Sequence, residues 1–146
     1  MELTMKPSKS PMKFSDKFNG RRVDDTLQAY YVFLENLQQD APHSGNEVQA
    51  LMLDRVDNVQ GQITFFSNNE SDQKKFLNKV LKLAKRKNLT KIFLGFANSD
   101  KDIIPDEKQN ELARQFKRIA GNLNIDLVDQ IILSERSYFS FKDNGL

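Results

Sequence analysis

Apolar residues recur every three or four positions in three stretches of the chain, and this spacing predicts three helices. The first runs from Val23 to Gln39, where Asp24 and Asp25 would lie in the first turn and interact favourably with the helix dipole. The second follows Ser71, which we expect to act as its N-cap. Its apolar stripe consists of Phe76, Leu77, Val80, Leu81 and Ala84.

The third helix is expected to open at Pro105, near Asp106, because proline suits the first helical turn. Gly121 and Asn122 lie near its expected end, where such residues are common. The residues on its predicted core face are Leu112, Phe116, Ile119 and Leu123.

Five short apolar runs predict strands at residues 48–54, 59–66, 91–97, 127–133 and 138–141. The first run has apolar residues on both faces, with Val48, Ala50 and Met52 opposite Leu51 and Leu53. In the second, glutamines at positions 60 and 62 alternate with apolar residues, which suggests one exposed face. The order α-β-β-α-β-α-β-β predicts an α/β fold, a mixed sheet with helices packed on it.

The chain of 146 residues has 22 basic and 20 acidic side chains, and its length suits one domain. The formal charge of +2 does not by itself point to nucleic acid or an anionic membrane as partner. We expect residues 1–20 to be a flexible lead-in, with positions 12–14 pairing at a sheet edge, and residues 21–146 to form the domain. No apolar run approaches the roughly 18 residues of a membrane span, and the start lacks the pattern of a signal peptide. We therefore expect a cytoplasmic protein without membrane contact.

Cysteine is absent and histidine occurs once, at His43. This excludes disulfide scaffolds, zinc fingers, iron–sulfur clusters and cysteine nucleophiles, as well as a zinc site built from two or more histidines of this chain. His43 lies in the segment DAPHSGNE without a serine–aspartate arrangement around it, and we interpret it as an ordinary surface residue. The composition predicts no cofactor.

The segment LVDQIILSERSYFSFKDNGL, Leu127 to Leu146, resembles the closing signature of bacterial RadC-type proteins, LDHxII followed by YxSFxxxG. Upstream, ALMLDRVDNVQG is similar to the hairpin of that family. KIFLGFANSDKDIIPDEKQNELARQFKRIA is similar to the segment that carries its HNHPSG motif. The resemblance covers the chain from about Asp24 onward. It implies the JAB/MPN metalloprotease-like fold, a cytidine-deaminase-like architecture that fits the predicted order of elements.

In catalytically competent JAB domains a His-x-His pair and a downstream Asp bind zinc, and a Glu on an earlier strand activates the water. When the last proline of the family's motif is aligned with Pro105, the two histidines fall at Phe96 and Asn98 and the aspartate falls at Gln109. The motif's serine falls at Asp106, and Thr64 is the nearest match to the carboxylate position. None of the three zinc-ligand positions keeps its ligand type in this register. The resemblance therefore implies a zinc hydrolase that has lost its site.

Four acidic residues cluster around the same loop and could bind a hard cation through oxygen, namely Asp100, Asp102, Asp106 and Glu107. The alternative is that Asp100 and Asp102 are ordinary loop residues while Asp106 and Glu107 stabilise a helix N-terminus. We favour the alternative, because a magnesium-dependent hydrolase would also need an activated nucleophile, for which the chain shows no candidate.

The stretch from residue 71 to residue 91 is strongly basic, with eight basic side chains against one acidic residue, Asp72. Six of them are candidates for contacts with nucleic-acid phosphates, namely Lys74, Lys75, Lys79, Lys82, Lys85 and Arg86. Such binding would depend on salt and would not depend on sequence. The alternative, which we favour, is a solvated helix face, since exposed aromatic residues do not alternate with the lysines.

Alternation in the last strand places Tyr138 and Ser140 on one face and Phe139 and Phe141 on the other. The rings could form a stacking platform for bases. We favour packing of Phe139 and Phe141 in the core.

The leading interpretation is a non-catalytic RadC-like JAB/MPN domain, a pseudo-metalloprotease that acts as a protein-interaction module. Its partner would be another protein or a second copy of this chain. One alternative is a sequence-independent nucleic-acid-binding protein in a DNA-repair or mobile-element context. The other is a divergent metal-dependent hydrolase.

Overall fold

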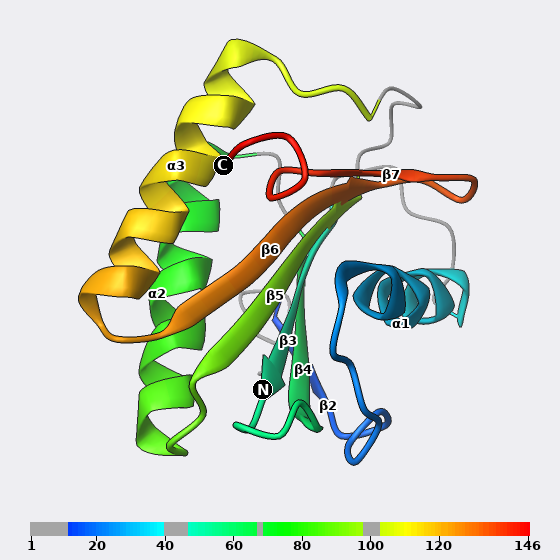
Figure 1. Cartoon of the computed structure of the whole chain (residues 1–146), viewed down its shortest axis with the longest axis vertical. Coiled ribbons are helices and arrows are strands. Elements are labelled where there is room, and N and C mark those ends of the chain that lie inside the picture. The colour runs from blue at the N-terminus through cyan, green and yellow to red at the C-terminus, as the bar shows by residue number, and fades with distance from the viewer. Residues whose placement is uncertain (1–11, 40–46, 67–68, 98–102) are drawn as a thin grey trace, which may run out of the picture.

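The structure, a computed structural model, describes residues 12–39, 47–66, 69–97 and 103–146. Within these ranges a sheet of six strands has the order β2-β4-β3-β5-β6-β7 (Figure 1). The strands are β2 (Lys13–Ser15), β3 (Glu47–Leu53), β4 (Val59–Phe66), β5 (Lys91–Ala97), β6 (Asp126–Leu133) and β7 (Tyr138–Ser140). The helices are α1 (Thr26–Gln39), α2 (Glu70–Arg86) and α3 (Glu107–Asn122).

The strands β5 and β6 pair in parallel, and all other pairs in the sheet are antiparallel. A parallel pair needs a crossover connection, and α3 supplies it between β5 and β6. The predicted α/β class and the predicted order of elements are confirmed, with β2 as an additional strand at the beginning. None of the helices in the described ranges has both the length and the hydropathy of a membrane span.

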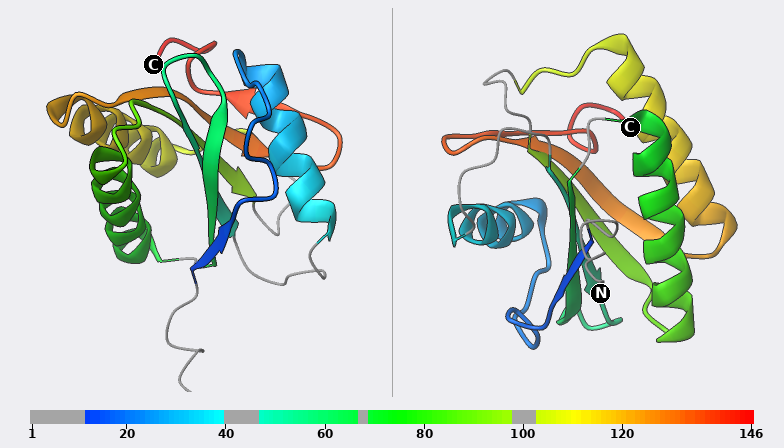
Figure 2. Two further views of the ribbon diagram at one scale, coloured as in Figure 1. Left: turned by 90° about the horizontal axis from the view of Figure 1, so that it is seen from below. Right: turned by 180° about the vertical axis from the view of Figure 1, so that it is seen from behind.

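The sheet separates two layers of helices, with α1 on one face and α2 beside α3 on the other (Figures 1 and 2). The predicted two-sided burial of β3 is confirmed, because Val48 and Met52 pack toward α2 and α3 while Leu51 and Leu53 pack toward α1. The apolar stripe predicted for α2 is buried at all five positions. Each helical layer therefore has its own hydrophobic core, and the sheet joins the two cores.

All three helices begin at positions other than those predicted. The helix α3 begins at Glu107 with Asp106 as its N-cap, so Pro105 precedes the helix and does not lie in its first turn. The helix α1 begins at Thr26 rather than Val23, and the Asp25 carboxylate accepts a hydrogen bond from the backbone N–H of Gln28 (2.9 Å). The helix α2 begins one residue before Ser71, because Asn69 is the N-cap and its side chain accepts from the Asp72 N–H. Asparagine caps a helix about as well as serine does, so the two neighbouring candidates could not be ranked by residue type.

The predicted exposed face of β4 is wrong at Gln62, which is 1% exposed. Gln60 is partly exposed, whereas Thr64 is also buried, because α1 covers this part of the strand. Asn36 of α1 donates to the side-chain oxygens of Gln49 and Thr64, and Gln62 donates to Gln49. Hydrogen bonds between polar side chains lower the cost of burying them, and alternation along one strand cannot reveal such contacts from other elements.

The core face of α3 is rotated by about one residue from the predicted one. Its fully buried side chains are Ala113, Phe116 and Ala120. The predicted Leu112 and Ile119 are only partly buried, and Leu123 is 36% exposed. Small alanines face the sheet here, and they allow α3 to approach it closely.

Part of the predicted flexible lead-in belongs to the folded domain. The strand β2 pairs with β4, where Phe14 lies opposite Ile63, so the predicted pairing at a sheet edge is confirmed to within one residue. Phe18 is 2% exposed and packs in the core under α1. The ordered structure therefore begins well before residue 21.

Candidate functional site

The candidate metal site lies where β5 ends and α3 begins. Phe96, at the first predicted ligand position, packs against the core under α2 and α3. Its ring stacks on that of Phe116 of α3, with 6.3 Å between the ring centroids. A hydrocarbon ring offers no lone pair to a metal, and this position therefore contributes packing between β5 and α3.

Gln109, at the predicted aspartate position, is part of a capping box at the start of α3. The Asp106 carboxylate accepts from the Gln109 N–H (2.8 Å), and the Gln109 side-chain oxygen accepts from the Asp106 N–H (2.9 Å). These bonds satisfy two backbone donors that a helix start leaves unpaired. The interpretation of Asp106 as a helix N-terminal residue is confirmed.

The structure does not bring Thr64 next to Phe96. Gln49 of β3 pairs with Thr64 on one side and with Gly95 on the other, so these three residues share the face toward α1. Phe96 is at the neighbouring position of the ladder and faces α2 and α3. The residue of β4 that shares the face and level of Phe96 is Phe65.

An acidic residue that the sequence interpretation missed lies beside the end of β5. Glu47 begins β3, is 2% exposed and lies directly opposite Ala97 in the β3–β5 ladder. The sequence interpretation placed the carboxylate position at Thr64, which lies on β4. The strand that pairs with β5 is β3. In the sequence, the signal for Glu47 is its position as an acidic residue directly before the predicted strand 48–54.

A carboxylate at Glu47 does not by itself make a zinc site. Zinc prefers nitrogen, sulfur and carboxylate ligands in a tetrahedral set. The residues present here are a buried carboxylate, an aromatic ring and an amide already bonded to a helix start, and they do not fit zinc. In the described ranges no group of three or more histidine, cysteine, aspartate or glutamate side chains is placed to hold a metal. The predicted positions His43, Asn98, Asp100 and Asp102 lie outside the described residues.

The aspartate and the serine of the closing signature, Asp129 and Ser140, are hydrogen-bonded to each other. Asp129 of β6 is 3% exposed, and one of its carboxylate oxygens accepts from the hydroxyls of Ser140 and Thr26. The other oxygen accepts from the backbone N–H groups of Gln130 (2.7 Å) and Lys142 (3.0 Å). All four contacts are donors to the carboxylate, which ties together β6, β7, the start of α1 and the C-terminal turn.

The aromatic residues in and directly after β7 pack against the domain, with Phe139 partly buried. Phe141 is buried, and its ring meets that of Phe139 edge-on, with 5.3 Å between the centroids. On the other face the ring of Tyr138 lies 4.7 Å from that of Tyr30, and the Tyr30 hydroxyl donates to the Ser134 carbonyl (2.8 Å). Burial, followed by the nearby tyrosines, raises the pKa of Tyr30 above its ordinary value.

The basic candidates all lie on α2. Lys75, Lys79, Lys82, Lys85 and Arg86 are exposed, and Lys74 is partly exposed. Within the described part of the chain none of these six side chains forms an ion pair. The exposure of these side chains agrees with both sequence interpretations of α2, a solvated face and a phosphate-binding surface.

Comparison with protein families matches residues 23–146 to the description RadC-like JAB domain. The match includes all three helices and every strand except β2. No curated protein matches the chain.

Proposed function

The chain belongs to the RadC-like JAB domain family, and from this membership and the site geometry we propose that it is a member without zinc catalysis that acts as a protein-interaction module. The observation that carries the proposal is the use of two former ligand positions for structure. Phe96 stacks on Phe116, and Gln109 completes the capping box of α3. A second copy of the chain or another protein would be the partner.

The first test is zinc binding. We expect the protein, purified without chelators and dialysed against zinc, to retain far less than one zinc ion per chain. Glu47→Gln should leave the retained zinc unchanged, because one carboxylate without imidazole partners is a weak zinc ligand. Atomic absorption measures the metal content. Stoichiometric zinc that is lost in Glu47→Gln would contradict the proposal.

The surface that supports an interaction role is the outer face of α1. Leu27 and Tyr31 lie one helical turn apart and are 44% and 56% exposed. The helix carries a single charged side chain, Glu35. Depletion of charge together with exposed tyrosine is typical of the centre of protein interfaces.

We expect the chain to self-associate through this face across the micromolar range, and Tyr31→Lys to shift the equilibrium to monomers. A buried interface residue replaced by a charge leaves an unpaired ion in the contact. Sedimentation velocity measures the distribution of species. The matched control is Val56→Lys, which places the same charge at another exposed apolar position, in the β3–β4 turn. A wild-type chain that remains monomeric, or equal effects of the two variants, would contradict the assignment to α1.

A further inference from the structure

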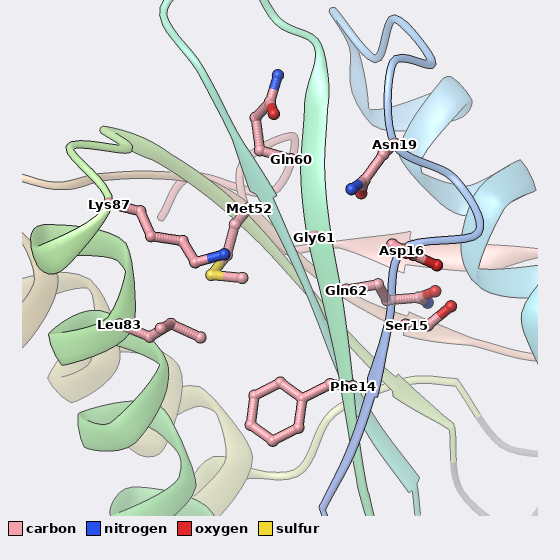
Figure 3. A pocket seen from close by; sticks show the side chains of 10 residues that line it. All are labelled: Phe14, Ser15, Asp16, Asn19, Met52, Gln60, Gly61, Gln62, Leu83 and Lys87. Atoms are coloured by element: carbon pink, nitrogen blue, oxygen red, sulfur yellow. The ribbon is translucent and has the colours of Figure 1, made fainter.

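A groove of about 330 Å³ lies at the C-terminal end of α2, where β2 ends beside β4 (Figure 3). Gly61 of β4 lies at its centre, and Leu83 and Lys87 reach toward it from α2. The ring of Phe14 forms a further wall, and Asn19 points in from the opposite side. The groove therefore combines apolar walls with one cation, Lys87, one carboxylate, Asp16, and the polar side chains of Ser15, Asn19, Gln60 and Gln62.

Phe14 gives this groove an aromatic surface that is open to solvent. Its side chain is 65% exposed, although it is the largest apolar side chain of β2. Its register partner Ile63 belongs to the core under α2, so Phe14 is on the same side of the sheet as the basic helix. No exposed aromatic residue alternates with the lysines in the sequence of α2. The fold supplies one from β2, because Phe14 lies beside α2.

The basic side chains of α2 lead to the groove along one ridge of the helix. Lys75, Lys79, Leu83 and Lys87 follow one another at intervals of four residues, so they share a face. At 1.5 Å per residue the ridge is about 18 Å long. Lys82 and Arg86 flank it on the adjoining ridge, and both are exposed.

The positive charge of the chain is concentrated in the layer of α2 and α3. The segments 70–87 and 107–122, which form the layer of α2 and α3, hold eleven basic and four acidic side chains, a local charge of +7. All other residues together hold eleven basic and sixteen acidic side chains, a charge of −5. The excess of positive charge on α2 and α3 attracts a polyanion to this side of the sheet.

We propose that the ridge of α2 and the groove at its end bind single-stranded nucleic acid. The phosphates would lie along Lys75, Lys79 and Lys87, and one unpaired base would enter the groove and stack on Phe14. A charged track next to an exposed ring is the combination by which proteins hold single strands without reading their sequence. The inference goes beyond the proposed protein-interaction role and does not depend on it.

Two other polyanions fit the surface less well. In a duplex the bases are paired and stacked, so Phe14 would have nothing to stack on. Anionic membranes are bound by basic helices that also insert large apolar side chains. Among the described residues, α2 itself has no exposed large apolar side chain to insert, because Ile104 and Leu123 lie beyond the two ends of α3 and Phe14 is a single ring on β2.

The test is fluorescence anisotropy with labelled oligothymidylate and oligouridylate of about twelve nucleotides, and with a duplex of the same length. We expect the full chain to prefer both single strands to the duplex. Phe14→Ala should weaken single-strand binding about tenfold and leave duplex binding unchanged, because only the stacking contact is lost. Because Phe14 is mostly exposed, the variant should fold, and circular dichroism checks this. Tighter binding of one of the two oligonucleotides would identify DNA or RNA as the preferred strand.

The electrostatic part is tested with the double variant Lys75→Glu and Lys79→Glu. It should abolish binding to both single strands, and in wild type the affinity should fall steeply with salt. Arg136→Glu with Lys142→Glu changes the net charge equally at exposed positions on and after the β6–β7 hairpin, and should bind nearly as wild type. The proposal is overturned if Phe14→Ala binds single strands as wild type does, or if both double variants lose binding equally. It is also overturned if the wild type binds phosphatidylserine vesicles or the duplex more tightly than single strands.

Discussion

Replacing Asp129 with alanine is expected to lower the free energy of unfolding by about 3–5 kcal/mol, a large part of the stability of a domain of this size. The carboxylate accepts four hydrogen bonds in the core, from Thr26, Gln130, Ser140 and Lys142. Without it, two backbone N–H groups lose their acceptor at a place that water reaches poorly. Urea denaturation followed by circular dichroism measures the loss.

Asp129→Asn should cost much less than Asp129→Ala. Its amide oxygen can still accept from the Gln130 and Lys142 N–H groups, and its NH₂ group can donate to the Thr26 and Ser140 hydroxyls, which can rotate to accept. The control Asp143→Ala removes an exposed carboxylate from the same C-terminal turn and should stay within about 0.5 kcal/mol of wild type. Equal losses in the alanine and asparagine variants would show that the charge, and not the hydrogen-bond geometry, stabilises the fold.

This geometry gives the closing segment a structural role. Asp129 and Ser140 are eleven positions apart in sequence and bond to each other because β6 and β7 form an antiparallel pair. Thr26 adds the start of α1, from the other end of the domain. The signature that supports family membership is thus a determinant of the fold, and its presence does not imply catalysis.

Periodicity predicted most of the fold because it reports local burial. The strand β5 has the predicted bounds, and the buried stripe of α2 is the predicted one. The burial of Gln62 could not be predicted, because it depends on a hydrogen bond to Gln49 of β3, which also accepts from Asn36 of α1. Likewise the packing of Ala113 and Ala120 of α3 depends on how closely that helix approaches the sheet.

The candidate sites likewise combine features that follow from local sequence with features that depend on how the elements pack together. The basic character of α2 follows from composition, whereas the groove requires Phe14, which is more than 60 positions from Lys79 in the chain. The position of Glu47 beside the end of β5 depends on the strand order, in which β3 lies between β4 and β5. Residue types along a single strand do not contain that information. The register on the family's proline motif places Phe96 and Gln109 at the junction of β5 and α3.

Replacing Gly95 with alanine is expected to lower the free energy of unfolding by about 2 kcal/mol, and Gly95→Val by more. A Cβ atom at Gly95 would lie 2.7 Å from a ring carbon of Phe33, which is fully buried between α1 and the sheet. The ring cannot move away without displacing α1, because protein interiors are close-packed. Thermal and urea denaturation of the variants measure the loss.

Two other glycines of the chain are matched controls for the same substitution. A Cβ at Gly61 would approach only the terminal methyl of Met52 (2.9 Å), which can adopt another rotamer, so Gly61→Ala should cost less than Gly95→Ala. Gly121 in α3 has nothing within 4 Å of such an atom, and Gly121→Ala should stabilise the helix by about 0.5–1 kcal/mol. A loss at Gly121 similar to that at Gly95 would contradict the steric explanation.

A double-mutant cycle separates the clash at Gly95 from any general effect of alanine in a strand. Phe33→Leu alone should destabilise the domain, because it removes buried volume under α1. Combined with Gly95→Ala it should cost less than the two single losses together, since the smaller side chain leaves room for the new methyl group. Residues in direct contact couple by about 0.5–3 kcal/mol, whereas independent sites add. Strict additivity would mean that α1 is not held against β5 by the contact between Phe33 and the bare backbone of Gly95.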